Sequence, residues 1–551
     1  MSEEKVDISN DKIDTTYVSH EIGSTFSKDK VDEDFYLQEP DIHTRMFYAQ
    51  RFIETQYEDI KSEKYFQRWN DFIFKSLKIN SLNDNGVEYP KWENNNLSMR
   101  TGHWMVGVGL VTSEIMGAYL VPNSMSMLGF VPSNILLVVF FFVTLFSGGV
   151  IWWVFLLFDS PEYPVKTFAD LAYIIGGQPF KQIVIFLQLI AVILSTGTIL
   201  IAAAQCAIIL RTDRMCWVGL MALIAGLMMC ISSIKKLSVI GKYCLVVSFC
   251  NYINLFVQLG YIGNDPPNWE NAMSLLGVPQ GAIETFAIVP GQSLMNRVVS
   301  VSNLSFVFAG SIVFPEIMSE MKKPWEFWKS MCTAQSFILG IYLIYGNFIY
   351  AHQGQFSNVP AVFGISDENA LKGLGFMTFI TSFIQGIFYG HIACKIIYKN
   401  YIPIFNKSIK LNSKIGLILW IGVVIITWIA IFVIGAGVPQ VGAVSSFTSA
   451  LTMIPLTFVI PFILHISALY IATNENDIVD YKPFEPVTSH TSLVQFWKNG
   501  YSKYWLLSIF YTGLCLASLS LSGMGLWASV EYMKYIFSST SADSFSCVSP
   551  V

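Results

Sequence analysis

The sequence predicts an all-α polytopic membrane protein, and three observations lead to this fold class. Hydrophobic residues make up 53% of the 551 residues and charged residues only 13%, whereas a soluble globular chain has about 25% charged residues. The mean hydropathy is +0.50. Residues 1–100 contain 33 of the 73 charged residues, so long uncharged runs occupy the rest of the chain. This composition argues against a large soluble enzyme, and the net charge of −5 argues against a nucleic acid partner.

Residues 1–100 are predicted to form a cytoplasmic tail. The first 40 are acidic and rich in Ser, Thr and Asp, a composition typical of disorder, and we expect no secretory signal peptide because they contain no apolar core segment. From His43 to Asn80, aromatic and aliphatic residues fall at near-helical spacing. This pattern fits either an amphipathic helix on the membrane or on the protein's inner face, or a loosely ordered linker. The tail is also a candidate binding site for cytoplasmic regulators.

The rest of the chain contains eleven segments that satisfy the length needed to cross a bilayer, about 20 apolar residues. They are 103–129, 132–158, 181–210, 214–233, 238–262, 301–320, 330–351, 374–398, 413–436, 445–472 and 504–530. We therefore expect a transmembrane domain over residues 101–535, surrounded by lipid, and a short C-terminal tail over residues 536–551.

The basic residues predict the orientation of these spans. With the N-terminus in the cytoplasm, the cytoplasmic loops and span ends contain 16 Lys and Arg residues and the opposite side contains 5. Cytoplasmic loops of membrane proteins have such an excess of basic residues. An odd number of spans then places the C-terminal tail on the non-cytoplasmic side.

The nine cysteines show no CxxC spacing, and none lies at metal-ligand spacing from a histidine. Seven of them lie in or beside apolar runs. We expect the cysteines to be small packing residues rather than a disulfide framework, and we expect no metal site and no cofactor.

The first and sixth spans are predicted to be broken helices. Gly117 in the first span is followed by Pro122, and Gly310 in the sixth is followed by Pro315. Glycine weakens a helix and proline removes a backbone hydrogen bond. A break inside the bilayer is costly unless the freed backbone groups face a cavity or a ligand, so the alternatives are a binding site or ordinary kinks.

The spacing of the two broken spans favours a binding site. They are five spans apart, so spans 1–5 and spans 6–10 are candidates for two equivalent halves. An odd number of helices per half makes the two halves inverted relative to each other. Matching broken helices in inverted halves indicate the central site of a secondary transporter.

The same two spans contain the only acidic residues placed within the eleven segments, Glu114, Glu316 and Glu320. A charge near the bilayer centre costs about 2.5–3.5 kcal/mol, so such a residue is expected to be functional. We predict that Glu114 carries a proton. Glu316 is either a second proton carrier or a capping or gating carboxylate near the cytoplasmic mouth.

Several uncharged polar residues lie within other spans. Such side chains either line a transport pathway or bridge neighbouring helices, which is the more common role. They are Gln188, Gln205, Asn251, Asn254, Thr378, Thr381, Ser382, Gln385 and His391.

The sixth span and the segment after it resemble a known signature. Residues 308–329 read FAGSIVFPEIMSEMKKPWEFWK, similar to the aromatic-Ala-Gly and acidic-Met-Lys-x-Pro-x-x-Phe-x-Lys pattern of the amino acid/auxin permease family. The first span, with Glu114, Gly117 and Pro122, is similar to the fungal neutral amino acid permease branch of that family. The resemblance extends over most of residues 100–530. Tyr119 is a departure, because relatives more often have small or aliphatic residues there.

The resemblance implies a LeuT-like inverted repeat of five plus five helices, an eleventh helix, and proton-coupled transport of amino acids. The spans contain too few charges for an acidic or a dibasic substrate, which favours neutral amino acids. The substrate carboxylate and ammonium would bind backbone groups at the two breaks. The predicted substrate-binding residues are Gly117, Ala118, Tyr119, Phe306, Phe308, Ala309, Gly310 and Ser311.

Other functions remain open from the sequence. One is a permease of the same fold for nucleobases or another small solute, and another is a nutrient-sensing receptor with little transport. An intramembrane enzyme is disfavoured because the histidines of spans 8 and 10 have no HExxH or paired-carboxylate context, and the sequence contains no Gly-rich phosphate loop. Several spans exceed 22 residues, which favours the plasma membrane over the vacuolar membrane.

Overall fold

A computed structural model describes most of the chain beyond residue 100. The described residues are 100, 102–112, 115–210, 216–234, 237–405, 414–438, 440–474, 493–539 and 544–548, with eight residues between 42 and 53. Within these ranges the secondary structure is helical, apart from one isolated bridge between Gly102 and Met321. The all-α prediction is therefore confirmed for the described residues.

Nine helical segments among the described residues are long and apolar enough to cross a membrane. They are α3 to α4 (Trp104–Leu128), α5 (Phe130–Phe158), α6 (Phe168–Ile209), α10 to α11 (Leu294–Glu320), η5 to η6 including α12 (Pro324–Phe356), most of α13 (Glu368–Phe405), α14 (Lys414–Gly437), α15 to α17 (Val441–Ile471) and most of α18 (Leu493–Ser539). Two further helices, α7 (Trp217–Ser232) and α8 (Leu237–Asn264), lie at the remaining predicted positions. The count of eleven spans stays a prediction.

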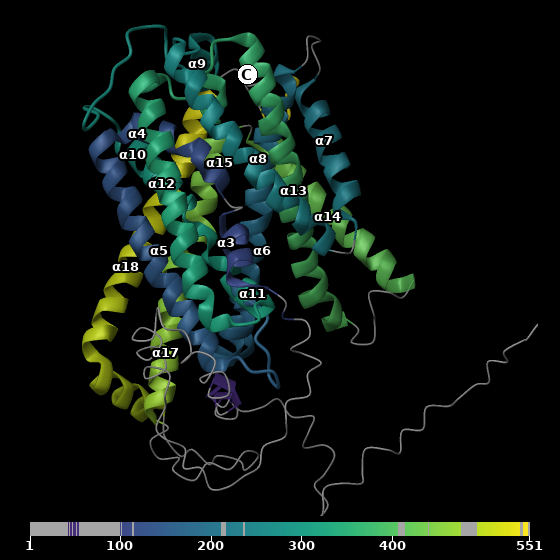
Figure 1. Cartoon of the computed structure of the whole chain (residues 1–551), viewed down its shortest axis with the longest axis vertical. Coiled ribbons are helices and arrows are strands. Elements are labelled where there is room, and N and C mark those ends of the chain that lie inside the picture. Colours follow the sequence, from purple (N-terminus) through teal and green to yellow (C-terminus); the bar gives the residue numbers. More distant parts are fainter. Residues whose placement is uncertain are drawn as a thin grey trace, which may run out of the picture. The chain divides into compact units, whose positions relative to one another are not determined.

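The helices pack in two groups (Figure 1). The first group, called the bundle here, contains α3, α4, α5, α10, α11 and α12 (Phe327–Gln353). The second group, called the scaffold, contains α6, α7, α8, α13 and α14. α15 (Val441–Thr448), η8 (Ser449–Met453), α16 (Ile454–Phe458) and α17 (Ile460–Asn474) pack with α18 beside α10 and α5. α9 (Trp269–Leu276) lies in the connection between α8 and α10.

Helix α6 begins 13 residues before the predicted start of the third span. The Thr167 side chain caps this helix by accepting a hydrogen bond from the Asp170 backbone N–H. Gly177 has φ 67°, which lets the chain kink just before Pro179, after which the helix continues. The predicted span rests on the apolar run alone. The helix begins before that run, so the prediction missed its first segment.

Both predicted breaks are present. In the first broken helix, α3 (Trp104–Thr112) ends before the 3₁₀ helix η3 (Ile115–Leu120), and α4 (Val121–Leu128) follows. In the sixth, α10 (Leu294–Phe306) ends before the 3₁₀ helix η4 (Ala309–Val313), and α11 (Phe314–Glu320) follows. The two prolines occupy the first turns of α4 and α11, where a missing N–H costs little.

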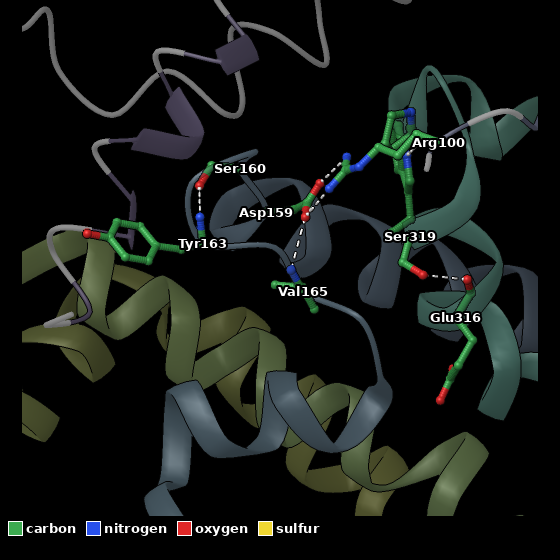
Figure 2. Close-up of polar contacts among 9 residues, drawn as sticks. Arg100, Asp159, Ser160, Tyr163, Val165, Glu316 and Ser319 are labelled. Carbon is green, nitrogen blue, oxygen red and sulfur yellow. Dashed lines mark hydrogen bonds and ion pairs between the residues drawn. The ribbon is translucent and has the colours of Figure 1, made fainter. Parts of the chain in front are cut away.

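The start of the broken helix in the first span lies against the end of the broken helix in the sixth span. The Gly102 N–H donates to the Glu320 carbonyl at 2.9 Å, and the Lys322 N–H donates to the Gly102 carbonyl at 2.9 Å. Beside this bridge, both terminal nitrogens of Arg100 donate to the Asp159 carboxylate at 2.8 Å (Figure 2). Asp159 also accepts from the Val165 N–H at 3.1 Å. We call this end of the bundle the inner end, because the predicted topology places it in the cytoplasm.

The expectation that the cysteines only pack is wrong for two of them. Cys216 and Cys547 form a disulfide across a sequence separation of 331 residues. The residues around Cys547 bind the ends of two scaffold helices: the Cys547 carbonyl accepts from the Trp217 N–H at 3.2 Å, and the Phe545 N–H donates to the Ala436 carbonyl at 3.1 Å. Local cysteine spacing does not reveal a pair so far apart in the chain.

Part of the predicted amphipathic helix lies among the described residues. The eight described residues between 42 and 53 are helical, and Met46, Ala49 and Phe52 on one face are buried. The Arg100 guanidinium lies 5.9 Å from the centre of the Phe52 ring. The rest of the predicted segment, up to Asn80, lies outside the described residues.

Candidate functional site

The break in the sixth helix frees carbonyl groups that neighbouring helices satisfy. The Tyr342 hydroxyl of α12 donates to the Val307 carbonyl at 3.0 Å. The Thr144 hydroxyl of α5 donates to the Phe308 carbonyl at 3.4 Å, and the Gln188 amide of α6 donates to the Ile312 carbonyl at 3.5 Å. Freed carbonyls inside a membrane are tolerated only with such partners or beside a cavity.

The break in the first helix is supported in the same way. The Tyr252 hydroxyl of α8 donates to the Thr112 carbonyl at 2.7 Å, at the end of α3. Gly117 in η3 lies against Val307, and a Cβ atom built on Gly117 would be 2.6 Å from the Val307 Cβ. The two breaks therefore touch, and the contact requires a residue without a side chain at position 117.

A cavity lies where the two breaks meet the scaffold. Its lining comes from η3, from α10 and η4, from α6 and α13, and from α15 and η8. No described residue that lines this cavity is acidic or basic. The polar side chains in its lining are Tyr119, Ser195, Thr198, Thr378, Ser382, Gln385 and Tyr389. The cavity thus combines backbone and mostly apolar groups from the two helix breaks with both apolar and uncharged polar side chains from α6 and α13.

Five of the eight predicted substrate-binding residues line the cavity, namely Gly117, Tyr119, Phe306, Ala309 and Gly310. The other three predicted residues are outside its lining. Ala118 is fully buried, Phe308 packs edge-on against Tyr342 at 5.4 Å between ring centres, and Ser311 is fully buried in η4.

Tyr119 also takes part in a buried network that joins the first broken helix to the scaffold. Its hydroxyl donates to the Asn251 side-chain oxygen at 2.7 Å and accepts from the Asn254 amide at 3.2 Å. The same Asn254 amide nitrogen donates to the Thr378 hydroxyl at 2.9 Å. Asn251 and Asn254, which the sequence marked as either pathway or bridging residues, thus bridge helices.

Of the other polar residues considered from the sequence, some line the cavity and others lie outside its lining. Thr378, Ser382 and Gln385 line the cavity, while Thr381 does not. The His391 Nδ1–H donates to the Ser232 carbonyl at 3.0 Å and so connects α13 to α7. Gln205 is buried in α6 outside the cavity lining.

Only one of the two predicted proton-coupling carboxylates lies among the described residues. Glu114 lies outside the described residues. Glu316 lies in the first turn of α11, outside the cavity lining, and its Oε1 accepts from the Phe168 N–H of α6 at 3.4 Å. Its backbone carbonyl accepts from the Ser319 hydroxyl at 2.7 Å, while its side chain points away from the ion pair of Arg100 and Asp159 (Figure 2). Glu316 therefore connects the bundle to the N-terminus of a scaffold helix.

Several lining residues carry no sequence signal of their own. Ser195, Thr198 and Tyr389 lie on long apolar helices where hydroxyl groups are common, and Val441 and Met453 reach the cavity from α15 and η8. η8 is a short π-helix, a deviation that is often found at functional sites. Their position in the lining depends on how α6, α13 and α15 pack, which local sequence does not determine.

Comparison with known proteins agrees with this architecture. A transmembrane transporter of Fusarium pseudograminearum is 26% identical over 174 residues, and the aligned part covers 31% of this chain and only 36% of that protein. A transmembrane transporter of Gibberella moniliformis is 22% identical over 402 residues, or 71% of this chain and 78% of that protein. Residues 100–482 match the family described as transmembrane amino acid transporter protein. Since this match covers more than half of the chain, the protein is a multi-pass membrane transporter that belongs to the transmembrane amino acid transporter family.

Proposed function

We propose that this protein moves neutral amino acids across a membrane by proton symport with alternating access. The observation that carries the proposal is the cavity between the two helix breaks, which is lined by backbone and uncharged side chains. A zwitterionic amino acid carries its own positive and negative groups. In this proposal, backbone N–H and carbonyl groups of η3 and η4, which line the cavity, bind its carboxylate and its ammonium, so no charged side chain is needed.

The proposed architecture is an eleven-span protein with an inverted repeat of five plus five helices. Two observations support it: a helix lies at each of the eleven predicted positions, and the start of the first broken helix lies beside the end of the sixth. Helices in corresponding positions of inverted halves run in opposite directions. The bundle then rocks against the scaffold and exposes the cavity to each side in turn. The proposed location is the plasma membrane.

Glu316 has a specific place in this cycle. Its hydrogen bond from the Phe168 N–H joins the bundle to the scaffold, so the rocking motion has to break this contact when the inner end opens. A carboxylate at a helix N-terminus is stabilised by the helix dipole. We assign Glu316 the role of an inner gate, with Glu114 as the principal proton carrier.

The test is uptake of labelled neutral amino acids by the purified protein in liposomes, with and without an inward proton gradient. Accumulation that depends on the gradient and is abolished by unlabelled neutral amino acids is the expected result. Competition by cytosine or adenine instead would assign the protein to nucleobase transport. Binding without accumulation would indicate a receptor.

The two carboxylates are separated by paired variants. Glu114→Gln removes the titratable group, and we expect it to abolish gradient-driven accumulation while exchange of substrate across the membrane continues. Glu316→Gln keeps an oxygen that accepts from the Phe168 N–H, whereas Glu316→Ala removes it. If Glu316 is a gate, the Gln variant retains coupled uptake and the Ala variant loses it. Equal loss of coupling in both would make Glu316 a proton carrier.

A further inference from the structure

Two hydroxyl groups in the cavity lining differ from the other polar side chains there. Ser195 of α6 and Ser382 of α13 are 5% and 0% exposed, and among the described residues neither hydroxyl has a hydrogen-bond partner. Buried polar side chains in proteins are nearly always hydrogen-bonded, because a buried group without a partner costs free energy. Both groups therefore need an explanation.

Their neighbours on the same helices are satisfied within the protein. On α6, the Thr198 hydroxyl donates to the Leu194 carbonyl at 3.1 Å. On α13, the Thr378 hydroxyl donates to the Leu374 carbonyl at 2.9 Å and accepts from Asn254. Donation to a carbonyl one turn earlier is the usual solution for a hydroxyl in a helix. Ser195 and Ser382 do not adopt it, although both residues belong to the cavity lining, so a molecule in the cavity is the candidate partner for their hydroxyl groups.

The position of the two serines indicates which part of a substrate they contact. The helix breaks, to which the proposed function assigns the carboxylate and the ammonium, lie on the bundle side. Ser195 and Ser382 lie on the opposite, scaffold side of the same cavity. An amino acid held by its backbone at the breaks points its side chain toward these hydroxyl groups.

We propose that Ser195 and Ser382 form the subsite for the substrate side chain, and that the preferred substrates are neutral amino acids with a hydroxyl or amide side chain. This assignment rests on the proposed function. A serine hydroxyl both donates and accepts a hydrogen bond, so it suits either kind of side chain. A purely aliphatic side chain would leave both hydroxyl groups unpaired in a closed cavity, which lowers its affinity.

Threonine and valine make the sharpest test because they have nearly the same shape and differ in one hydroxyl. In liposomes that contain the full chain, we expect a KM for threonine about three- to tenfold lower than that for valine, the size of one or two neutral hydrogen bonds. Ser195→Ala and Ser382→Ala should each raise the KM for threonine and leave that for valine nearly unchanged. Ser133→Ala is the matched control, since Ser133 is also fully buried and without a partner among the described residues but lies outside the cavity lining.

Other outcomes separate the two levels of inference. Uptake with equal KM values for threonine and valine would overturn the subsite while leaving amino acid transport intact. An equal change for both substrates in the serine variants would also overturn it, because it would indicate contact with the amino acid backbone or a packing effect. No accumulation of any amino acid would overturn the proposed function and this assignment with it. If a variant fails to fold, the side-chain preference is tested on the wild-type protein instead. Threonine should raise the melting temperature of the wild type more than valine does at equal concentration, and an equal shift would overturn the subsite.

Discussion

Arg100 and Asp159 form a buried ion pair at the inner end of the bundle, with side-chain exposures of 4% and 2%. The two parallel hydrogen bonds of this pair have the geometry in which Arg binds a carboxylate most strongly. The pair holds the chain before α3 against the end of α5, and the Val165 N–H adds a third contact to the carboxylate. Each charge is thus buried only because the other is present.

We predict that Arg100→Ala lowers the free energy of unfolding by about 3–5 kcal/mol, since it leaves the Asp159 carboxylate buried without its partner. The measurement is the midpoint of denaturation of the purified protein in detergent. Lys534→Ala is the control, because Lys534 and Glu531 form an exposed pair that should contribute less than about 0.5 kcal/mol. The double variant Arg100→Ala/Asp159→Ala should recover part of the loss. A loss in the double variant equal to the sum of the two single losses would contradict this coupling.

At the same scale, the sequence indicated some of the residues that line the cavity and missed others for a physical reason. Gly117 and Gly310 were predictable because glycine, proline and a carboxylate together are unusual inside a span. Ser195 and Tyr389 were not, because a hydroxyl on an apolar helix looks the same whether it lines a cavity or bridges helices. Phe308 is outside the cavity lining, and its ring packs against Tyr342, so its predicted contact with substrate stays a prediction.

The two broken helices are the elements on which the proposed cycle depends. Their contact is close at Gly117, where an added Cβ would also lie 2.9 Å from the Tyr342 hydroxyl. Tyr342 already holds the Val307 carbonyl, so it cannot move without releasing part of the second break. The conformation of one break therefore depends on that of the other.

Gly117→Ala is expected to reduce uptake about 5- to 150-fold, because overpacking of this kind costs about 1–3 kcal/mol and separates the breaks. Initial rates of uptake in liposomes, corrected for the amount of protein, measure the effect. Gly149→Ala on α5 is the matched control, since a Cβ there meets no atom of the described residues within 4 Å, and alanine is the better helix former. Equal rates for Gly117→Ala and the wild type would show that the breaks tolerate separation.

Helix positions were more predictable than helix lengths. Apolar runs reveal where a chain crosses the bilayer, and helices lie at all eleven predicted positions. The same runs say little about where a helix continues into the loops, so α6 and α13 begin before, and α18 ends after, the predicted spans. Capping by Thr167 and the left-handed conformation of Gly177 set the start of α6, and neither depends on hydropathy.

At the scale of the whole molecule, the disulfide and the basic residues both bear on the orientation of the spans in the membrane. Cys216 and Cys547 lie in segments that the excess of cytoplasmic Lys and Arg assigns to the opposite side of the membrane. Disulfides persist in oxidising environments outside the cytosol. Charge bias and disulfide position are independent properties of the chain, and from both we infer that this end of the scaffold lies on the non-cytoplasmic side.

Cys216→Ser should expose the Cys547 thiol to a membrane-impermeant maleimide applied to intact cells, because the partner sulfur is gone. In the wild type, Cys216 and Cys547 should react with the maleimide only after treatment with a reductant. A mass shift on a gel counts the tags, and Cys206→Ser, which removes a buried free thiol, should match the wild type. Tagging of the Cys216→Ser variant only after permeabilisation would reverse the orientation.

The link between Cys216 and Cys547 also closes residues 216–547 into a covalent ring. A single cut in any loop within this ring leaves both pieces part of one molecule. The two pieces stay covalently joined through the disulfide after such a cut. Only a cut together with a reductant breaks the covalent link between them. A nicked transporter would therefore keep its parts at one location in the membrane.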